Sequence, residues 1–176
     1  MKYAAQDELV LAIFPTSKDF AYAYFEAPLS PIDWGVKRIR GRDKNAQSLA
    51  IVERLCNALR PDTIVIEDCV LSRTRRHPRI RRLYSLIATF AHTENIDLAC
   101  YARAAVRKTF NEDGTIRRHE MAQVIASNIP AFAHSLPRQR KLWKAEDRRL
   151  ALFDAAALAL THFAFVPSYE EPPSRQ

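Results

Sequence analysis

The chain of 176 residues has the length of one compact domain, and its 48% hydrophobic and 27% charged residues are typical of a globular protein rather than a disordered one. Its 27 Lys and Arg residues outnumber its 20 Asp and Glu residues, and the resulting formal net charge of +7 favours a polyanionic partner. The three scattered cysteines exclude a zinc ribbon, and the three scattered glycines argue against Walker-type and Rossmann-type phosphate loops.

The sequence also bears on localisation and domain organisation. No segment approaches the roughly 18 consecutive apolar residues that a transmembrane helix needs. Gln6, Asp7 and Glu8 stand where a signal peptide would need apolar residues, and no disulfide framework is evident, so we expect a cytoplasmic protein. We expect one domain over residues 1–166 and a flexible, proline-rich tail over residues 167–176.

The N-terminal part of the chain predicts three successive strands. Leu9–Phe14 has the pattern of a buried strand that ends at Pro15. The aromatic segment Phe20–Phe25 predicts a second strand, paired with the first through a short turn, and Ile32–Ile39 predicts a third.

Helices and strands alternate in the remainder. Helical spacing of apolar residues predicts a helix over Asn45–Leu59, and the β-branched run Thr63–Ile66 predicts a central strand covered on both faces. A helix that begins at Pro78 precedes a fifth strand, Ile96–Tyr101. Two short helices, an irregular basic segment and a long final helix follow, over Ala104–Phe110, Arg117–Ser127, Pro130–Lys144 and Asp147–Phe163. This order predicts an α/β layered domain with a mixed sheet.

Two carboxylates, Glu67 and Asp68, come directly after the predicted central strand. Because strand residues alternate between faces, these two side chains point in opposite directions. One interpretation is that the strand has simply ended and both acids lie in water. The other is that one acid is held at the carboxyl end of a central strand, where open α/β sheets place their ligands.

A further carboxylate, Asp154, lies within the apolar final helix. A rotation of about 100° per residue places it on a face of small and apolar residues, formed by Leu150, Ala151, Ala157, Leu158 and Thr161. Burial there is costly unless a cation compensates the charge. An arginine partner is one solution, and a divalent metal is the solution we favour. Asp147, two turns earlier, is either the N-cap of this helix or a further ligand, and Glu146 is a weaker candidate.

Three arginine-rich clusters accompany these acids, over residues 73–82, 103–119 and 138–149. Arginine binds phosphate in a bidentate manner, so three such clusters around carboxylates favour a nucleic acid as partner. The candidate nucleic-acid contacts are Arg73, Arg75, Arg76, Arg79, Arg107, Lys108, Arg118, Arg140, Lys141 and Arg148. A protein-interaction scaffold, whose arginines bind acidic protein surfaces, is the alternative from another class.

Taken in order, these motifs resemble the RuvC-type Holliday-junction resolvases of the RNase H-like superfamily. Residues 11–17 are similar to the first strand and turn of that family, and residues 64–67 to its acidic central strand. Residues 105–108 and the region around Arg118 resemble its basic regions, and residues 154–162 resemble its terminal catalytic helix. The resemblance implies an RNase H-like fold with a mixed five-stranded sheet, of three antiparallel N-terminal strands followed by parallel strands, flanked by helices. It also implies a homodimer.

As to activity, the resemblance implies an endonuclease that uses Mg²⁺ or Mn²⁺ on structured or branched DNA. Carried over residue by residue, it makes Glu67 and Asp154 catalytic metal ligands. Asp147, as a further catalytic ligand, or Asp68 would have to supply a third carboxylate from a position that the family does not match.

The chain departs from the family pattern at two catalytic positions. Phe14 stands where the family has an Asp on the first strand, and Ala151 stands where it has an acid one turn before the last Asp. Asp19, beyond Phe14, could replace the first acid only in an unusual hairpin. A catalytically inactive DNA-binding or protein-interaction adaptor is therefore the alternative function.

Overall fold

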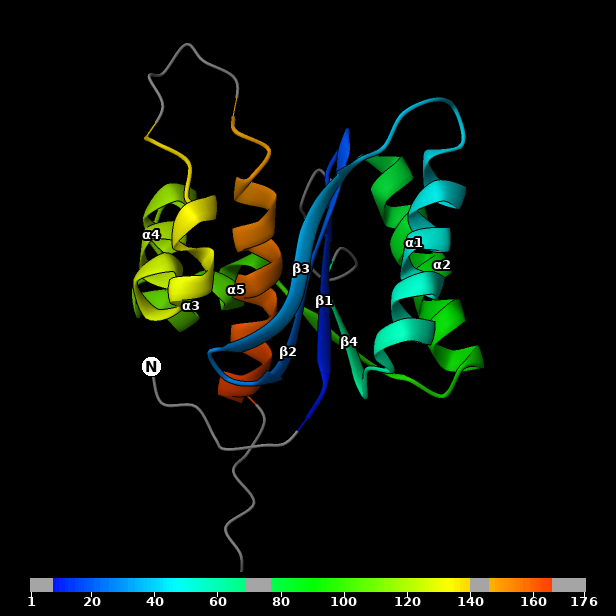
Figure 1. The fold of residues 1–176 in the computed structure, drawn as a ribbon, viewed down its shortest axis with the longest axis horizontal. Coiled ribbons are helices and arrows are strands. Elements are labelled where there is room, and N and C mark those ends of the chain that lie inside the picture. The colour runs from blue at the N-terminus through cyan, green and yellow to red at the C-terminus, as the bar shows by residue number, and fades with distance from the viewer. Residues whose placement is uncertain (1–7, 69–76, 140–145, 166–176) are drawn as a thin grey trace, which may run out of the picture.

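The computed structural model describes residues 8–68, 77–139 and 146–165, and these residues form a five-stranded sheet with helices on both faces (Figure 1). The strands are β1 (Val10–Pro15), β2 (Asp19–Ala27), β3 (Ser30–Arg38), β4 (Thr63–Glu67) and β5 (Asp97–Tyr101). The helices are α1 (Lys44–Leu59), α2 (Pro78–Thr93), α3 (Arg103–Phe110), α4 (Arg118–Asn128), the 3₁₀ helix η1 (Pro130–Ser135) and α5 (Leu150–Phe165).

The strand order is β3-β2-β1-β4-β5. β1, β2 and β3 form an antiparallel meander, whereas β4 and β5 run parallel to β1. The mixed sheet predicted from the sequence is confirmed. Because β1 and β4 are parallel and adjacent, their carboxyl ends lie at the same edge of the sheet.

Strand alternation divides the apolar residues between two cores, one on each face of the sheet. Val10, Ala12 and Phe14 of β1 pack in the core that contains α5, whereas Leu11 and Ile13 pack in the core that contains α1 and α2. In Figure 1, α3, α4 and α5 accordingly lie on one side of the sheet and α1 and α2 on the other.

The most deeply enclosed helix is α5, which is apolar nearly all round. From Leu150 to Phe163 every residue except Asp154 is buried. The sheet covers one side of this helix, and α3, α4 and η1 cover the other. An enclosed helix of this kind gives a carboxylate few routes to water.

The C-terminal part of the chain departs from the sequence expectation in two ways that bear on the site. α5 begins at Leu150 rather than at Asp147, because residues 147–149 form a turn in which the Leu150 N–H donates to the Asp147 carbonyl at 3.1 Å. Pro130–Ser135, expected to be irregular, forms a 3₁₀ helix. That turn is anchored by Phe132, a fully buried side chain whose ring packs edge-on against Trp34 at 5.0 Å.

Among the described residues, no helix is both long enough and apolar enough to cross a membrane. The tail expected over residues 167–176 lies outside the described part of the chain.

Candidate functional site

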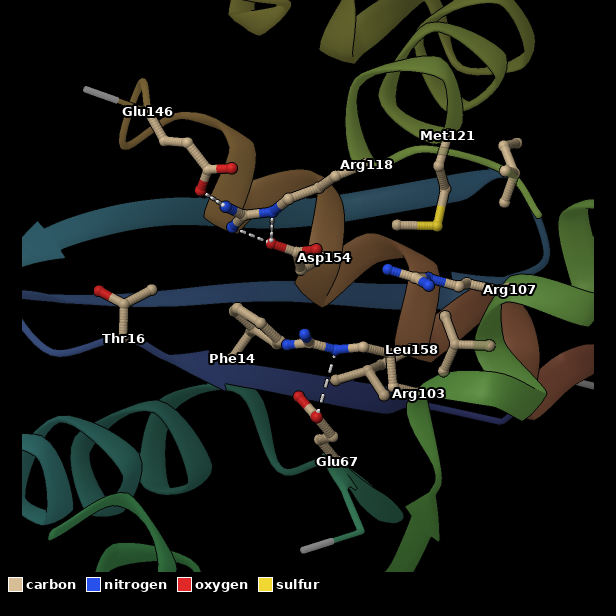
Figure 2. Close-up of a pocket in the computed structure, with 12 residues that line it drawn as sticks. Phe14, Thr16, Glu67, Arg103, Arg107, Arg118, Met121, Glu146, Asp154 and Leu158 are labelled. Atoms are coloured by element: carbon tan, nitrogen blue, oxygen red, sulfur yellow. Dashed lines mark hydrogen bonds and ion pairs between the residues drawn. The ribbon is translucent and has the colours of Figure 1, made fainter. Parts of the chain in front are cut away.

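A cavity of about 400 Å³ opens at the edge of the sheet where β1 and β4 end (Figure 2). β1 and β4 contribute side chains from their carboxyl ends, α3, α4 and α5 contribute most of the remaining wall, and the connecting segments contribute Thr16, Ile116 and Glu146. The lining residues are Phe14, Thr16, Glu67, Arg103, Val106, Arg107, Ile116, Arg118, Met121, Glu146, Asp154 and Leu158. The cavity therefore brings together acidic, basic and apolar groups from distant parts of the sequence.

Local structure explains how the two predicted acids reach this cavity. Glu67 follows Val65 by two residues, and Val65 packs in the core that contains α5, so Glu67 lies on that same face of β4. Only 3% of Glu67 is exposed. Asp154 lies one turn before Leu158 on α5, and both residues line the cavity. Glu67 and Asp154, predicted separately, thus line one site.

The basic side chains also follow from helix geometry. Arg103 and Arg107 are four residues apart on α3, so they lie on one face of that helix. Arg118 is the first residue of α4, whose start is fixed by the Arg117 N–H donating to Glu120 Oε2 at 2.9 Å. Figure 2 shows the three arginines extending into the cavity, two of them from α3 and one from the start of α4.

A hydrogen-bonded network in the site joins Arg118 to two carboxylates. Arg118 Nε donates to Asp154 Oδ2 at 2.7 Å, and Nη2 donates to the same oxygen. Its third nitrogen, Nη1, donates to Glu146 Oε2. The exposed fractions of the side chains are 11% for Asp154, 28% for Arg118 and 50% for Glu146. One guanidinium therefore joins a largely buried acid, Asp154, to an exposed acid, Glu146.

The aromatic ring of Phe14 contacts the Arg118 guanidinium. The Arg118 guanidinium carbon lies 5.9 Å from the centre of the Phe14 ring, within the range of a cation–π contact. At this position on β1 the resemblance to the resolvases implies a catalytic Asp. Here the strand instead presents an aromatic face to an arginine.

Glu67 has a cation of its own. Arg103 Nε lies 3.5 Å from Glu67 Oε1, and 49% of the Arg103 side chain is exposed. Glu67 and Asp154 are therefore each paired with an arginine of the chain itself. This is the arginine-partner solution that the sequence left open for Asp154.

Burial dominates the proton affinity of Asp154. It raises the pKa of this carboxyl above the usual value, the nearby Glu67 raises it further, and Arg118 and Arg103 oppose the change. For Arg118, burial favours a lower pKa, but Asp154 and Glu146 outweigh it and raise that pKa, so the guanidinium stays charged.

The acids considered as a third ligand are directed elsewhere. Asp147 is held by Arg149, which donates to it from its backbone N–H at 2.9 Å and from Nη2 at 2.7 Å. These hydrogen bonds lower the pKa of Asp147, and the one from the Arg149 side chain has the larger effect. Asp68 is the residue after β4, where continued strand alternation directs a side chain away from the face of Glu67, and its N–H donates to the Tyr101 carbonyl at 2.9 Å. Of the described residues, neither Asp147 nor Asp68 lines the cavity.

Asp19 does not replace the missing acid of the first strand either. Its Oδ1 lies 2.8 Å from Arg38 Nε, and it is not one of the described residues that line the cavity. Glu146, ranked below Asp147 from the sequence, is the acid that lines the cavity instead.

A divalent metal does not fit the residues present. Mg²⁺ and Mn²⁺ prefer several oxygen ligands. Within residues 8–68, 77–139 and 146–165, no group of three or more His, Cys, Asp or Glu side chains is arranged to hold a metal ion. Glu67 and Asp154 face arginines, and Phe14 offers no oxygen.

The predicted basic contacts are distributed over several places. Arg107 and Arg118 line the cavity. Lys108 and Arg148 are exposed but are not among the described residues that line it. Arg79 serves as an anchor, since it donates to the Thr16 carbonyl at 2.6 Å and to Asn45 Oδ1 at 3.0 Å. The remaining candidates, Arg73, Arg75, Arg76, Arg140 and Lys141, lie outside the described residues.

Arg103 lies in the arginine-rich cluster 103–119 but was not among the candidate nucleic-acid contacts predicted from the sequence. Its position in the chain nevertheless points to the site. Arg103 follows β5, a strand parallel to β4, so it starts from the same edge of the sheet as Glu67. The carboxyl ends of parallel strands are the usual place for functional groups in open sheets.

No protein-family model matches the sequence, and no curated protein is detectably similar to it in sequence. Solved structures do match the fold. Thermus thermophilus RuvC in complex with a Holliday junction substrate matches with a TM-score of 0.66 and 15% identity, over 89% of this chain and 94% of that chain. The yeast mitochondrial Holliday junction resolvase Ydc2 matches with a TM-score of 0.61 and 15% identity, over 92% and 79%. Fowlpox virus resolvase, in a complex with Holliday junction DNA, matches with a TM-score of 0.53 and 14% identity, over 90% and 99%. At these identities the likeness shows a shared fold.

Proposed function

We propose that this chain, which has the RuvC-like form of the RNase H-like fold, binds structured or branched DNA. The support comes from the fold together with the cavity, where Arg103, Arg107 and Arg118 converge at the carboxyl ends of β1 and β4. Among the fold neighbours, the RuvC and fowlpox virus resolvase structures contain Holliday junction DNA. The basic net charge of +7 favours the same class of partner.

The observation that carries the proposal is the convergence of three guanidinium groups on one concave site. Arginine presents planar donors that suit phosphate oxygens. Two of the three, Arg103 and Arg118, also neutralise Glu67 and Asp154, so the acids of the cavity need not repel a DNA backbone. We therefore propose that DNA binding at this site requires no divalent cation.

A gel-shift series with linear, forked and four-way DNA tests binding. We expect the four-way junction to bind most tightly, with an affinity that falls steeply with salt, by a slope of about 0.9 for each phosphate contact. EDTA should leave the affinity unchanged. Equal and weak binding to all three DNAs would contradict the proposal, and so would competition by acidic proteins but not by DNA.

Metal-dependent cleavage of branched DNA is the second candidate function. Its support is that Glu67 and Asp154, the two acids carried over from the resolvase resemblance, line the same cavity. Against it stand Phe14 on β1 and the arginine partners of both acids. We therefore place the non-catalytic function first.

A titration of the purified chain with Mn²⁺ and Mg²⁺ on four-way DNA separates the two functions. The non-catalytic function gives no product at any metal concentration, with DNA affinity unchanged. Metal-dependent product that is lost in both Glu67→Gln and Asp154→Asn, with DNA binding retained, would establish the nuclease instead. Light scattering on the same samples tests the homodimer that the resolvase resemblance implies.

A further inference from the structure

We propose that Glu146 acts as a built-in substitute for a DNA phosphate: it covers one edge of Arg118 until a phosphate displaces it. This inference rests on the proposed DNA-binding function and deepens it, since it names the group that binds phosphate and the carboxylate that regulates access. It arises from the unequal surroundings of the two acids that share Arg118.

The Arg118 guanidinium has one permanent and one exchangeable partner. Nε and Nη2 both donate to Asp154, whose side chain is 11% exposed and belongs to the enclosed helix α5. Nη1 donates to Glu146, whose side chain is 50% exposed and which lies outside α5, before the turn that leads into Leu150. Asp154 and the ring of Phe14 fix the plane of the guanidinium, whether or not Glu146 is present.

A phosphate suits the place that Glu146 occupies. Carboxylate and phosphate oxygens are both anionic acceptors for guanidinium donors, so one can replace the other without rearrangement of the arginine. Arg107 lines the same cavity and supplies a further positive charge to a phosphate that enters. Once displaced, the Glu146 carboxylate can return to water at little cost, because an ion pair this exposed is weak.

Substitution of Glu146 by Gln tests the inference, with Glu53→Gln as the matched control. Both substitutions raise the net charge by one, but Glu53 is exposed on α1, on the opposite face of the sheet from the cavity. We expect Glu146→Gln to bind four-way DNA about threefold to tenfold more tightly than the unmodified chain, and Glu53→Gln to bind within about twofold of it. Equal effects of the two substitutions would overturn the inference, while DNA binding by both would leave the proposed function intact.

A titration with inorganic phosphate, followed by NMR of the arginine Nε–H signals, tests the same site without DNA. The Arg118 signal, assigned by its loss in Arg118→Lys, should move at a lower phosphate concentration in Glu146→Gln than in the unmodified chain or in Glu53→Gln. An Arg118 signal that responds identically in all three chains would overturn the inference. If the unmodified chain bound no DNA, the proposed function would fail, and this titration would decide the inference alone.

Discussion

The helix α5 carries two ionisable side chains into the apolar core, Asp154 and His162, and the two differ in what surrounds them. Asp154, near the start of the helix, borders a cavity that also contains three arginines. His162, two turns later, lies in a closed cluster. Its Nδ1 is 3.0 Å from the Tyr101 hydroxyl, its Nε2 is 3.1 Å from Glu8 Oε1, and Thr63 donates to that same oxygen at 2.5 Å.

The comparison separates two reasons for burying a polar group. The His162 cluster satisfies its own hydrogen bonds and is not among the described residues that line the cavity, so it fastens the start of β1 to the end of α5. At the Asp154 site, by contrast, three arginines line an open cavity, and Arg118 is the one that is hydrogen-bonded to Asp154. A polar residue in an apolar helix therefore does not mark a binding site unless a cavity and charged side chains from other elements accompany it.

The largest effect should come from Arg118→Met, which leaves the Asp154 carboxylate in α5 without its hydrogen-bonded cation. Breaking a buried ion pair costs about 3–5 kcal/mol, and because Arg118 is 28% exposed we expect a loss of roughly 2–4 kcal/mol in the free energy of unfolding. Urea denaturation measures it. The double variant Arg118→Met/Asp154→Leu should recover most of the loss, because no unpaired carboxylate then remains at position 154.

The loss in Arg118→Met should depend on pH in a defined direction. Burial raises the pKa of Asp154, and removal of Arg118 should raise it further. Below this pKa the carboxyl is protonated and needs no cation, so the loss should be smaller at acid pH and should grow as the pH rises through the pKa. Urea denaturation at about pH 5 and about pH 8 checks the sign. A loss that is larger at the lower pH would mean that the Asp154 charge is not what Arg118 compensates.

An intermediate effect should come from His162→Phe, which sharpens the contrast between the two places. It leaves Tyr101 and Glu8, which are both only partly buried, without their shared partner. An unsatisfied buried group costs roughly 1–3 kcal/mol, so we expect a loss near the lower end of that range. The affinity for four-way DNA should stay unchanged. His92→Phe, at an exposed position of α2, is the control for stability. Weaker DNA binding by a stably folded His162→Phe variant would break the comparison, because both ends of α5 would then serve the ligand.

The smallest effect should come from Arg107→Gln, with Lys108→Gln as its matched control. The two residues are neighbours on α3, both are exposed, and each substitution removes one positive charge, but of the two only Arg107 lines the cavity. We expect Arg107→Gln to weaken four-way DNA binding about threefold to tenfold and to lower the salt slope by about 0.9, and Lys108→Gln to change affinity less than about twofold. The reverse order would move the DNA contact from the cavity to the outer surface of α3.

Much of the site was predictable, because its acids follow local periodicity. The β-branched run before Glu67 identified a central strand, and alternation placed Glu67 and Asp68 on opposite faces; the structure then showed that Glu67 shares the α5 face with Val65. The apolar stripe around Asp154 identified a carboxylate that needed a cation. These inferences hold because strand and helix periods are properties of the backbone, independent of the rest of the chain.

The same reasoning misjudged the relative positions of Asp147 and Glu146, because it started the final helix at Asp147. In the structure α5 starts at Leu150, and residues 147–149 form a turn that Arg149 stabilises. Helical rotation therefore does not apply to Asp147, and Glu146 is the acid that reaches the cavity. A shift of about one turn in the start of a helix is therefore enough to change which of two neighbouring side chains lines a cavity.

The sequence by itself determined the sheet, the faces of its strands and the burial of a negative charge in the last helix. Only the tertiary structure decided which cation pairs with that charge. It is Arg118, thirty-six residues away in the chain, which also contacts the Phe14 ring and hydrogen-bonds to Glu146. The physical reason is that periodicity fixes the direction of a side chain within its own element, whereas the partner of a charge depends on how distant elements close around it.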